Sequence, residues 1–235
     1  NDVSKQQNFK IDILSSRGLS QLIDICGKDI DFKECFYDEQ TYKLLQSGNN
    51  IGITLAESPL MRKALLKIKP KTVSDIAKCL AIIRPAAKDA RMSDNEIDFD
   101  TKFIYDDDAI TILSKLLNIN YDLADKFRRC ISKDKWDEKN RKQYNNLMSK
   151  ISVQNRNYIN DTLSNLKKYS FCKSHSYSYA QLVYKLAYQK THNPKKFWKA
   201  TLKNTHSSYR KWVHLYEARL AGVNVNKYIL KKNDL

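Results

Sequence analysis

The sequence predicts a mainly α-helical protein with a small β element at its N-terminus, an α+β arrangement. Apolar residues recur at intervals of three and four through most of the chain, which is the period of amphipathic helices. Apolar and charged side chains alternate in the segment 9–14, which is the period of a half-buried strand. Hydrophobic residues make up 42% of the chain. No apolar run approaches the roughly 20 residues that span a bilayer, so a globular protein with a real core is expected.

Four helices are expected before residue 85. Pro59 suits the first turn of the third helix, and Thr72 or Ser74 can cap the fourth, which Arg84-Pro85 ends. Between the second and third helices, Ile51–Leu55 has the composition of a short β-type run. The expected helices are 19–26, 38–47, 59–70 and a fourth that runs from its cap at Thr72 or Ser74 to Arg84-Pro85, with Ile76, Cys79, Leu80 and Ile83 facing inward.

Further helices are expected after a polar surface connection at 86–102. The highly charged segment 133–150 should be anchored by Trp136, Tyr144 and Leu147. The other expected helices are 109–117, 122–130, 157–168, 197–202 and 212–221, the last closed by Gly222.

The positive charge is concentrated near the C-terminus. The whole chain carries a net charge of +16, and residues 165–235 hold 15 Lys and Arg against 2 Asp and Glu, with 12 aromatic residues among them. Basic residues interleaved with aromatic ones suit a polyanionic partner such as nucleic acid. A solvated basic surface would give the same counts, so charge indicates only the class of partner.

The five cysteines argue against a metal or disulfide framework. Their number is odd and no pair has CxxC spacing, so neither a zinc site nor a set of disulfides is indicated. Reduced thiols in a cytosolic compartment are expected.

The stretch 169–188 is the strongest candidate for a site. It is expected to open as a polar loop with Lys173, Ser174 and His175 and to continue as a helix. A cation and an imidazole where a helix begins can hold an anion, because the first turn also offers unpaired N–H groups. The alternative is a basic loop that only caps a core helix.

This stretch closely resembles a segment of a known family. Tyr-Ser-Phe-Cys-Lys-Ser-His-Ser is similar to the Tyr-Gly-Phe-Asn-Lys-Ser-His-Ser-type run in the fingers of bacterial C-family replicative DNA polymerases, such as the alpha subunit of DNA polymerase III. Ser170 and Cys172 replace the family's glycine and asparagine. Similar blocks follow the family's order over roughly residues 9–225, among them Phe9–Leu14, Ile51–Met61, Leu80–Pro85, Phe103–Tyr105 and Ala124–Arg129.

The resemblance implies roles for particular residues. Asp12 matches the third catalytic carboxylate of the palm, which is a ligand of the two-Mg²⁺ site. Lys10 matches the lysine that touches the incoming triphosphate. Arg128 and Arg129 match the pair that grips the triphosphate from the fingers, since guanidinium groups can bind phosphate oxygens bidentately. The alternative is a pair of arginines that complement the dipole at a helix C-terminus. The remaining residues implied in nucleotide binding are Arg84, Lys173, Ser174 and His175.

The resemblance also implies an organisation and an activity. Residues 1–20 would be the C-terminal strand of the palm, 21–225 the fingers, and 226–235 a tail or the start of a following region. The complete enzyme would add deoxynucleotides to a primer 3′ end, as a cytoplasmic protein of a bacterium or phage-infected cell. This chain alone is not expected to polymerise, because a lone Asp12 cannot hold two metals.

The partners expected of the complete enzyme are primed template DNA, an incoming dNTP and the rest of the palm and the other polymerase regions. A sliding clamp and replisome subunits would join through regions outside this chain, and no membrane is expected. The other interpretation is a non-catalytic, degenerate or viral relative that acts as a basic nucleic-acid-binding or structural protein. Ser170 and Ala86, which stand where the family has glycines, favour it.

Three consecutive acids, Asp106-Asp107-Asp108, imitate a metal cluster. Consecutive residues on a helix point in different directions, so they are a poor ligand set. Acids in the first turn of a helix complement its dipole, which is the expected explanation.

Overall fold

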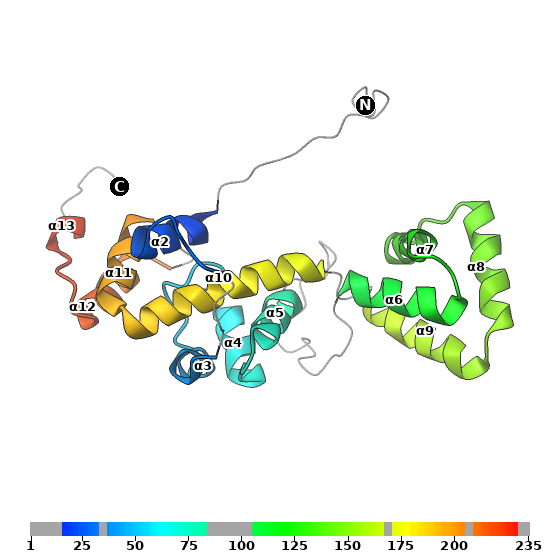
Figure 1. Ribbon diagram of the computed structural model, residues 1–235, viewed down its shortest axis with the longest axis horizontal. Helices are drawn as coiled ribbons and strands as arrows, with labels where there is room; N and C mark the ends of the chain where they lie inside the picture. The colour runs from blue at the N-terminus through cyan, green and yellow to red at the C-terminus, as the bar shows by residue number, and fades with distance from the viewer. Residues whose placement is uncertain (1–15, 33–36, 84–104, 167–170, 205–208, 230–235) are drawn as a thin grey trace, which may run out of the picture.

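The protein is mainly helical, which confirms the predicted fold class (Figure 1). The computed structural model describes residues 16–32, 37–83, 105–166, 171–204 and 209–229. Within these ranges there is no strand, only an isolated parallel bridge between Tyr105 and Phe171. The expected β element at 9–14 lies outside the described residues. None of the described helices is long and apolar enough to cross a membrane.

The helices alternate with short connections along the chain. Their bounds are α2 (Arg17–Cys26), α3 (Glu39–Gln46), α4 (Pro59–Ile68), α5 (Val73–Ile82), α6 (Asp106–Leu117), α7 (Tyr121–Lys133), α8 (Glu138–Lys150), α9 (Val153–Leu166), α10 (Lys173–His192), α11 (Pro194–Lys203), α12 (Lys211–Leu220) and α13 (Asn226–Ile229).

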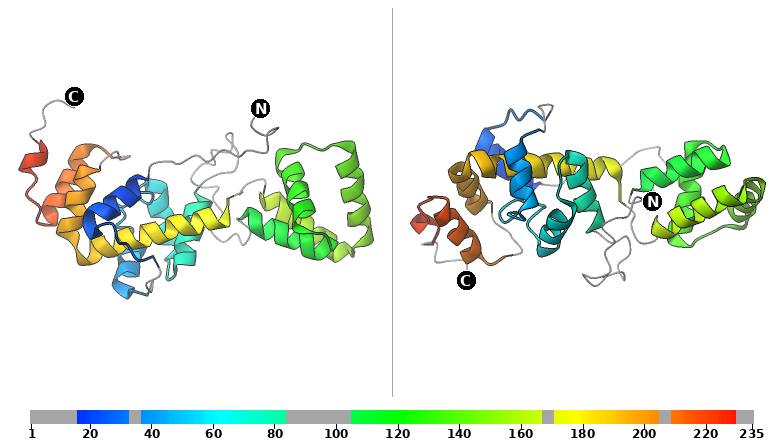
Figure 2. Two further views of the ribbon diagram at one scale, coloured as in Figure 1. Left: turned by 45° about the horizontal axis from the view of Figure 1, so that its top comes forward. Right: turned by 90° about the horizontal axis from the view of Figure 1, so that it is seen from below.

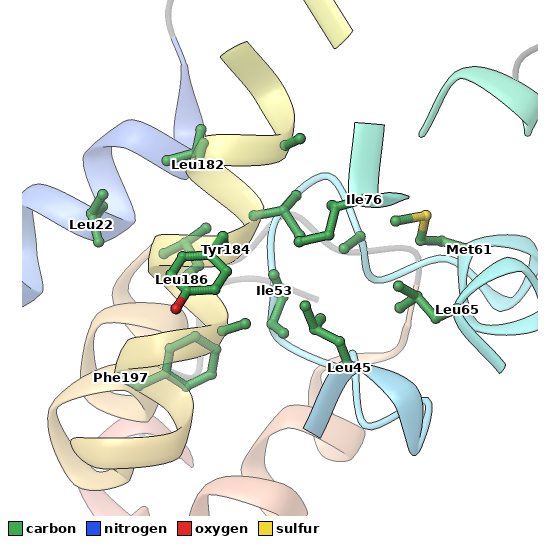
Figure 3. Packing of buried hydrophobic residues seen from close by; sticks show 14 of the residues in the cluster. Leu22, Leu45, Ile53, Met61, Leu65, Ile76, Leu182, Tyr184, Leu186 and Phe197 are labelled. Carbon is green, nitrogen blue, oxygen red and sulfur yellow. The ribbon is translucent and has the colours of Figure 1, made fainter. Parts of the chain in front are cut away.

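The long helix α10 is the axis of the larger of two helix groups. It packs against α2, α3, α5 and α11, and Figure 2 shows it running through this group in both views. Apolar side chains from these helices and from α4 form one core around Tyr184, Leu186 and Phe197 (Figure 3). The Tyr184 hydroxyl accepts a 2.8 Å hydrogen bond from the backbone N–H of Asp38, which ties α10 to the start of α3. We call this group, α2–α5 with α10–α12, the α10 group.

The helices α6–α9 form a second group with its own smaller core. Phe127 is fully buried there and meets Tyr144 edge-on at 5.3 Å and Trp136 at 6.2 Å between ring centroids. Leu147 packs against the same core, so the three predicted anchors of the charged segment are confirmed. We call this the α6–α9 group.

The two groups meet at the beginnings of α6 and α10. Tyr105 packs there with Ala81 and Ile82 of α5 and with the half-buried rings of Phe171 and Tyr177. The Asp106 N–H donates to the Phe171 carbonyl oxygen at 3.1 Å. The connection therefore consists of a small apolar patch and a few polar contacts.

Local sequence signals set several helix ends as predicted. Pro59 begins α4, as predicted, and Ser58, which was not predicted, is its N-cap; Thr72, one of the two candidate caps, is the N-cap of α5. Thr72 and Asp75 form a reciprocal capping box, in which each side chain accepts from the other's backbone N–H. These ends follow from contacts within four residues, which is why the sequence predicts them.

The predicted β-type run at Ile51–Leu55 is wrong, because this segment forms consecutive turns. Gly52 and Leu55 adopt the left-handed backbone, with φ of +84° and +73°, which no strand allows. A Cβ at Gly52 would lie 2.9 Å from the ring of Trp198, so glycine is also needed for the close approach of α11. Lys190 fixes the same loop by donating to the carbonyl oxygens of Asn49 and Ile51 at 2.9 and 2.8 Å.

The expected loop at Lys173–His175 is a second correction, because these residues form the first turn of α10. Buried Ser176 donates to the Ala77 carbonyl oxygen at 2.7 Å, and Tyr177 contacts the Ser74 hydroxyl at 2.7 Å. These bonds hold the beginning of α10 against α5, so the helix begins at Lys173, with Cys172 as its N-cap.

Candidate functional site

The first turn of α6 consists of three aspartates. Asp106, Asp107 and Asp108 occupy the helix start, as the sequence predicts, where carboxylates interact favourably with the exposed N–H groups. Their role extends beyond the dipole, because each contacts another helix. Asp107 and Asp108 contact the first residue of α10, and Asp106 contacts α7.

Lys173 is held at this turn through both its backbone and its side chain. Its backbone N–H donates to Asp107 Oδ2 at 2.9 Å, and its Nζ lies 3.2 Å from Asp108 Oδ1. The ammonium group also lies 5.7 Å from the centroid of the Tyr105 ring, within the range of a cation–π interaction. Cys172, the N-cap of α10, makes no side-chain capping bond. The Asp107 carboxylate of α6 therefore takes the place of the acceptor that an N-cap side chain would supply.

Ser174 and His175 are exposed beside Lys173. The His175 ring lies 4.1 Å from the Tyr179 ring and 5.6 Å from the Phe171 ring, measured between ring centroids, and is tilted against them by 57° and 45°. The Ser174 hydroxyl lies 3.2 Å from the Cys172 sulfur. These two side chains thus offer a hydroxyl and an imidazole to the solvent at the start of α10.

Arg128 and Arg129 on α7 converge on a single carboxylate. Arg128 Nη2 and Nε lie 2.7 and 2.8 Å from Asp125 Oδ1, and Arg129 Nη2 lies 2.6 Å from Asp125 Oδ2. Arg128 also reaches Asp106 Oδ1 at 3.1 Å through Nη1, which links α7 to the acidic turn of α6. The Arg128 side chain is only 12% exposed, whereas that of Arg129 is 65% exposed.

The two arginines beside Asp125 favour the ionised form of its carboxyl group. Burial alone would raise the pKa of Asp125, but the hydrogen bonds from Arg128 and Arg129 outweigh it and hold the pKa below its ordinary value. The cations are thus already balanced by protein carboxylates. An external anion at this place would have to take over contacts that aspartates make.

The structure brings together only some of the predicted site residues. Lys173 and Arg128 meet at one turn of α6, with Arg129 beside Arg128 and with Ser174 and His175 following Lys173. The other predicted residues, Lys10, Asp12 and Arg84, lie outside the described residues.

The alternative for the arginine pair, a role at a helix C-terminus, does not fit Arg128. Helix α7 continues to Lys133, so Arg128 lies inside the helix and its guanidinium contacts side chains. Sequence reasoning missed Asp125 as the central partner. The spacings of three and four residues from Asp125 to the two arginines were the available signal.

In the part of the chain that the structure describes, no group of three or more His, Cys, Asp or Glu side chains is arranged to hold a metal. The described residues therefore do not form a metal site by themselves.

Comparison with known proteins identifies similar sequences. Residues 17–102 match a family described as the bacterial DNA polymerase III alpha subunit finger domain. The chain is 29% identical over 206 residues to the DNA polymerase III subunit alpha of Thermotoga maritima, covering 81% of this chain and 24% of that protein. It is 26% identical to the Halalkalibacterium halodurans subunit, and this match covers 97% of this chain and 23% of that protein. It is 27% identical to the Bacillus subtilis subunit, and this match covers 92% of this chain and 22% of that protein.

The chain spans about a quarter of the length of these curated relatives. The matched family and the relatives confirm the resemblance to C-family polymerase fingers that the sequence indicated.

Proposed function

We propose that this chain, a fingers region of the C-family of DNA polymerases, binds the triphosphate of an incoming deoxynucleotide within a template-directed DNA polymerase. The observation that carries this proposal is the contact of one turn of α6 with both Arg128 and Lys173. Two cations from different helices are thereby held at one place, as a ligand with several phosphate groups requires.

The cluster suits an anionic ligand that can replace the aspartate carboxylates as the partner of the arginine and lysine cations. Asp106, Asp108 and Asp125 neutralise the cations Arg128, Arg129 and Lys173 in the absence of nucleotide, which limits the repulsion among these three cations. Phosphate oxygens can accept the same hydrogen bonds with similar geometry. Because Arg129 is the more exposed arginine, it would make the first contact, and Arg128 would follow by leaving Asp106.

The chemistry of the complete enzyme assigns roles to the residues nearer the N-terminus. Phosphoryl transfer depends on positioning and charge stabilisation. A divalent metal, Mg²⁺, would supply Lewis-acid stabilisation when bound, with Asp12 as one ligand and the others from carboxylates outside this chain. Lys10 and Arg84 would contact the nucleotide from the palm side and the fingers side, with primed template DNA as the other substrate.

A specific observation favours a second candidate, a non-catalytic nucleic-acid-binding relative. Arg128 is almost buried and makes ion pairs with two aspartates, which is also what a purely structural network would show. In that case the cluster would stabilise the α6–α9 group without binding nucleotide.

Substitution of Arg129 in a polymerase that contains this chain separates the two candidates. Arg129→Ala should lose a charge-assisted hydrogen bond of about 1.5–3 kcal/mol, which corresponds to roughly a tenfold to hundredfold lower kcat/KM for the nucleotide. Affinity for primed DNA should change little. The matched control is Arg141→Ala, which removes an exposed arginine from α8 and should leave kcat/KM unchanged.

Melting curves of the same preparations complete the test. A lower melting temperature for Arg129→Ala with normal kcat/KM would mean that the ion pairs are structural and would refute nucleotide binding. A loss of kcat/KM with an unchanged melting temperature is the expected result.

A further inference from the structure

Helix α12 carries an exposed apolar face at the far end of the α10 group. Trp212, Tyr216 and Leu220 are 63%, 57% and 67% exposed. Their spacing of four residues places them along one side of the helix. The opposite side is fixed, because His214 and Ala218 are buried where α12 packs against α11. The orientation of the exposed side therefore follows from the packing of the helix.

Exposed large apolar residues in a row mark an interaction surface more often than isolated ones do. Arg219 lies on the same side, three residues after Tyr216 and seven after Trp212, and it is exposed. Among the described residues it has no ion-pair partner within 4.0 Å. Arg219 thus lies on the same face of the helix as the two aromatic residues and the leucine. We call Trp212, Tyr216, Arg219 and Leu220 the α12 face.

The surroundings of the α12 face are strongly basic. Within the described residues 193–204 and 209–229, Glu217 is the only carboxylate. The exposed cations of these segments are Lys195, Lys196, Lys199, Lys203, Arg210, Lys211, Arg219 and Lys227, of which Lys203 is paired with Asp24 of α2 at 2.7 Å. A second copy of this chain would bring the same positive charge to the contact, which disfavours self-association. A polyanion is the occupant whose charge is complementary.

We propose that the α12 face binds single-stranded nucleic acid, with bases stacked on Trp212 and Tyr216 and phosphates neutralised by Arg219 and the neighbouring lysines. Aromatic rings accept any base, whereas the bases of a duplex are already stacked on one another. Trp212 and Tyr216 are separated by about 6 Å along the helix axis, from a rise of about 1.5 Å per residue. A stacked strand advances only about 3.4 Å per nucleotide. The spacing therefore fits bases that have been drawn apart.

Helix α12 lies at the outer end of the α10 group, whereas the first turn of α6, which holds the Arg128 cluster, lies where the two groups meet (Figures 1 and 2). The α12 face would contact an unpaired part of the DNA strand, away from the incoming nucleotide. This inference extends the proposed function to the template but draws on separate residues, so each can fail without the other.

The test uses the whole chain and an oligothymidylate of about 16 nucleotides, the upper size of common single-strand sites. Of the three tryptophans, Trp198 is buried, Trp136 is half-buried and only Trp212 is exposed. Binding should therefore quench the fluorescence of Trp212. Trp212→Ala and Tyr216→Ala should each weaken binding of a labelled oligomer by about fivefold to a hundredfold, measured by anisotropy.

Two controls distinguish stacking from charge. Tyr121→Ala removes a tyrosine of similar exposure, 59%, from α7 in the α6–α9 group and should not change the affinity. An abasic oligomer of equal length keeps the phosphates but offers no bases. It should bind more weakly and should not distinguish wild type from Trp212→Ala.

The inference is overturned if Trp212→Ala and Tyr216→Ala bind the oligomer as well as wild type does while circular dichroism shows both to be folded. Equal affinity for a duplex of the same phosphate number, unaffected by Trp212→Ala, would also overturn it. If Trp212 emission instead depends on protein concentration without DNA, the α12 face is a contact between copies and the proposal fails.

Discussion

The two helix groups are stabilised by different kinds of interaction. The α10 group surrounds a 20-residue helix with a continuous apolar core, and its buried polar side chains are tied to backbone oxygens. The α6–α9 group has a smaller core, and the cations at its edge are held by carboxylates. A close-packed apolar core holds its helices in one arrangement, because a side chain that shifts leaves an unfavourable void behind it. Ion pairs near the surface are weak enough to be exchanged for a ligand. The first group is thus suited to be a scaffold and the second to bind an anion.

The largest expected effect tests whether the two groups are separate. Phe127→Ala should destabilise the α6–α9 group by about 3–5 kcal/mol, because it removes the most buried ring of that core. Trp136 lies in the α6–α9 group and Trp198 in the α10 group, so each reports its own group when it is the only tryptophan left in the chain. Denaturation followed through Trp136 in a Trp198→Phe, Trp212→Phe background should shift, while the transition followed through Trp198 in a Trp136→Phe, Trp212→Phe background should stay nearly unchanged.

Phe197→Ala is the reciprocal variant, since Phe197 is fully buried in the α10 group. It should move the transition that Trp198 reports. If either substitution moves both transitions equally, the chain unfolds as one cooperative unit and the division into two groups is wrong.

A smaller effect is expected at Lys190, the ammonium group buried within the scaffold. Its Nζ donates to three oxygens at 2.7–2.9 Å and lies 5.3 Å from the centroid of the Trp198 ring. Lys190→Met should lower the free energy of unfolding by about 2–3 kcal/mol, because it leaves buried carbonyl oxygens without donors. Urea unfolding followed through Trp198 measures this. Lys199→Met, at an exposed position on α11, should have almost no effect.

Lys190 also predicts a dependence of stability on pH. Burial lowers its pKa to about 8, against the opposing effect of the Glu217 and Glu57 carboxylates. Between about pH 8 and 9.5 the unfolded chain retains a proton that the folded chain has lost, so wild type should gain stability as the pH rises. The gain should be at most about 1.4 kcal/mol per pH unit and absent in Lys190→Met. Equal slopes for both proteins would show that Lys190 does not titrate in this range.

The same contrast explains what the sequence could predict. The ends of α4 and α5 depend on Ser58, Pro59 and the Thr72–Asp75 box, which act within four residues. The turns around Gly52 could not be foreseen, because they depend on Trp198 and Lys190, which are distant in sequence.

The candidate site shows the same limit. The resemblance to polymerase fingers pointed to Arg128, Arg129 and Lys173, but periodicity could not show that Asp106 and Asp108 would contact two of them. The pairing of Asp106 with Arg128 joins two helices and requires the folded α6–α9 group. The acids that were explained by the helix dipole alone are thus also part of the candidate site.

The most direct test of the account is the effect of the α6 carboxylates on nucleotide binding. If a triphosphate replaces Asp106 on Arg128, Asp106→Asn should lower the KM for the nucleotide by about twofold to fivefold, because a competing ion pair of about 0.5–1 kcal/mol has been removed. The value of kcat should stay unchanged. Asp122→Asn removes the same charge from an exposed position at the start of α7 and serves as the control. Steady-state kinetics on a polymerase that contains this chain should show the lower KM for Asp106→Asn only. An unchanged or higher KM for Asp106→Asn would contradict the exchange of carboxylate for phosphate.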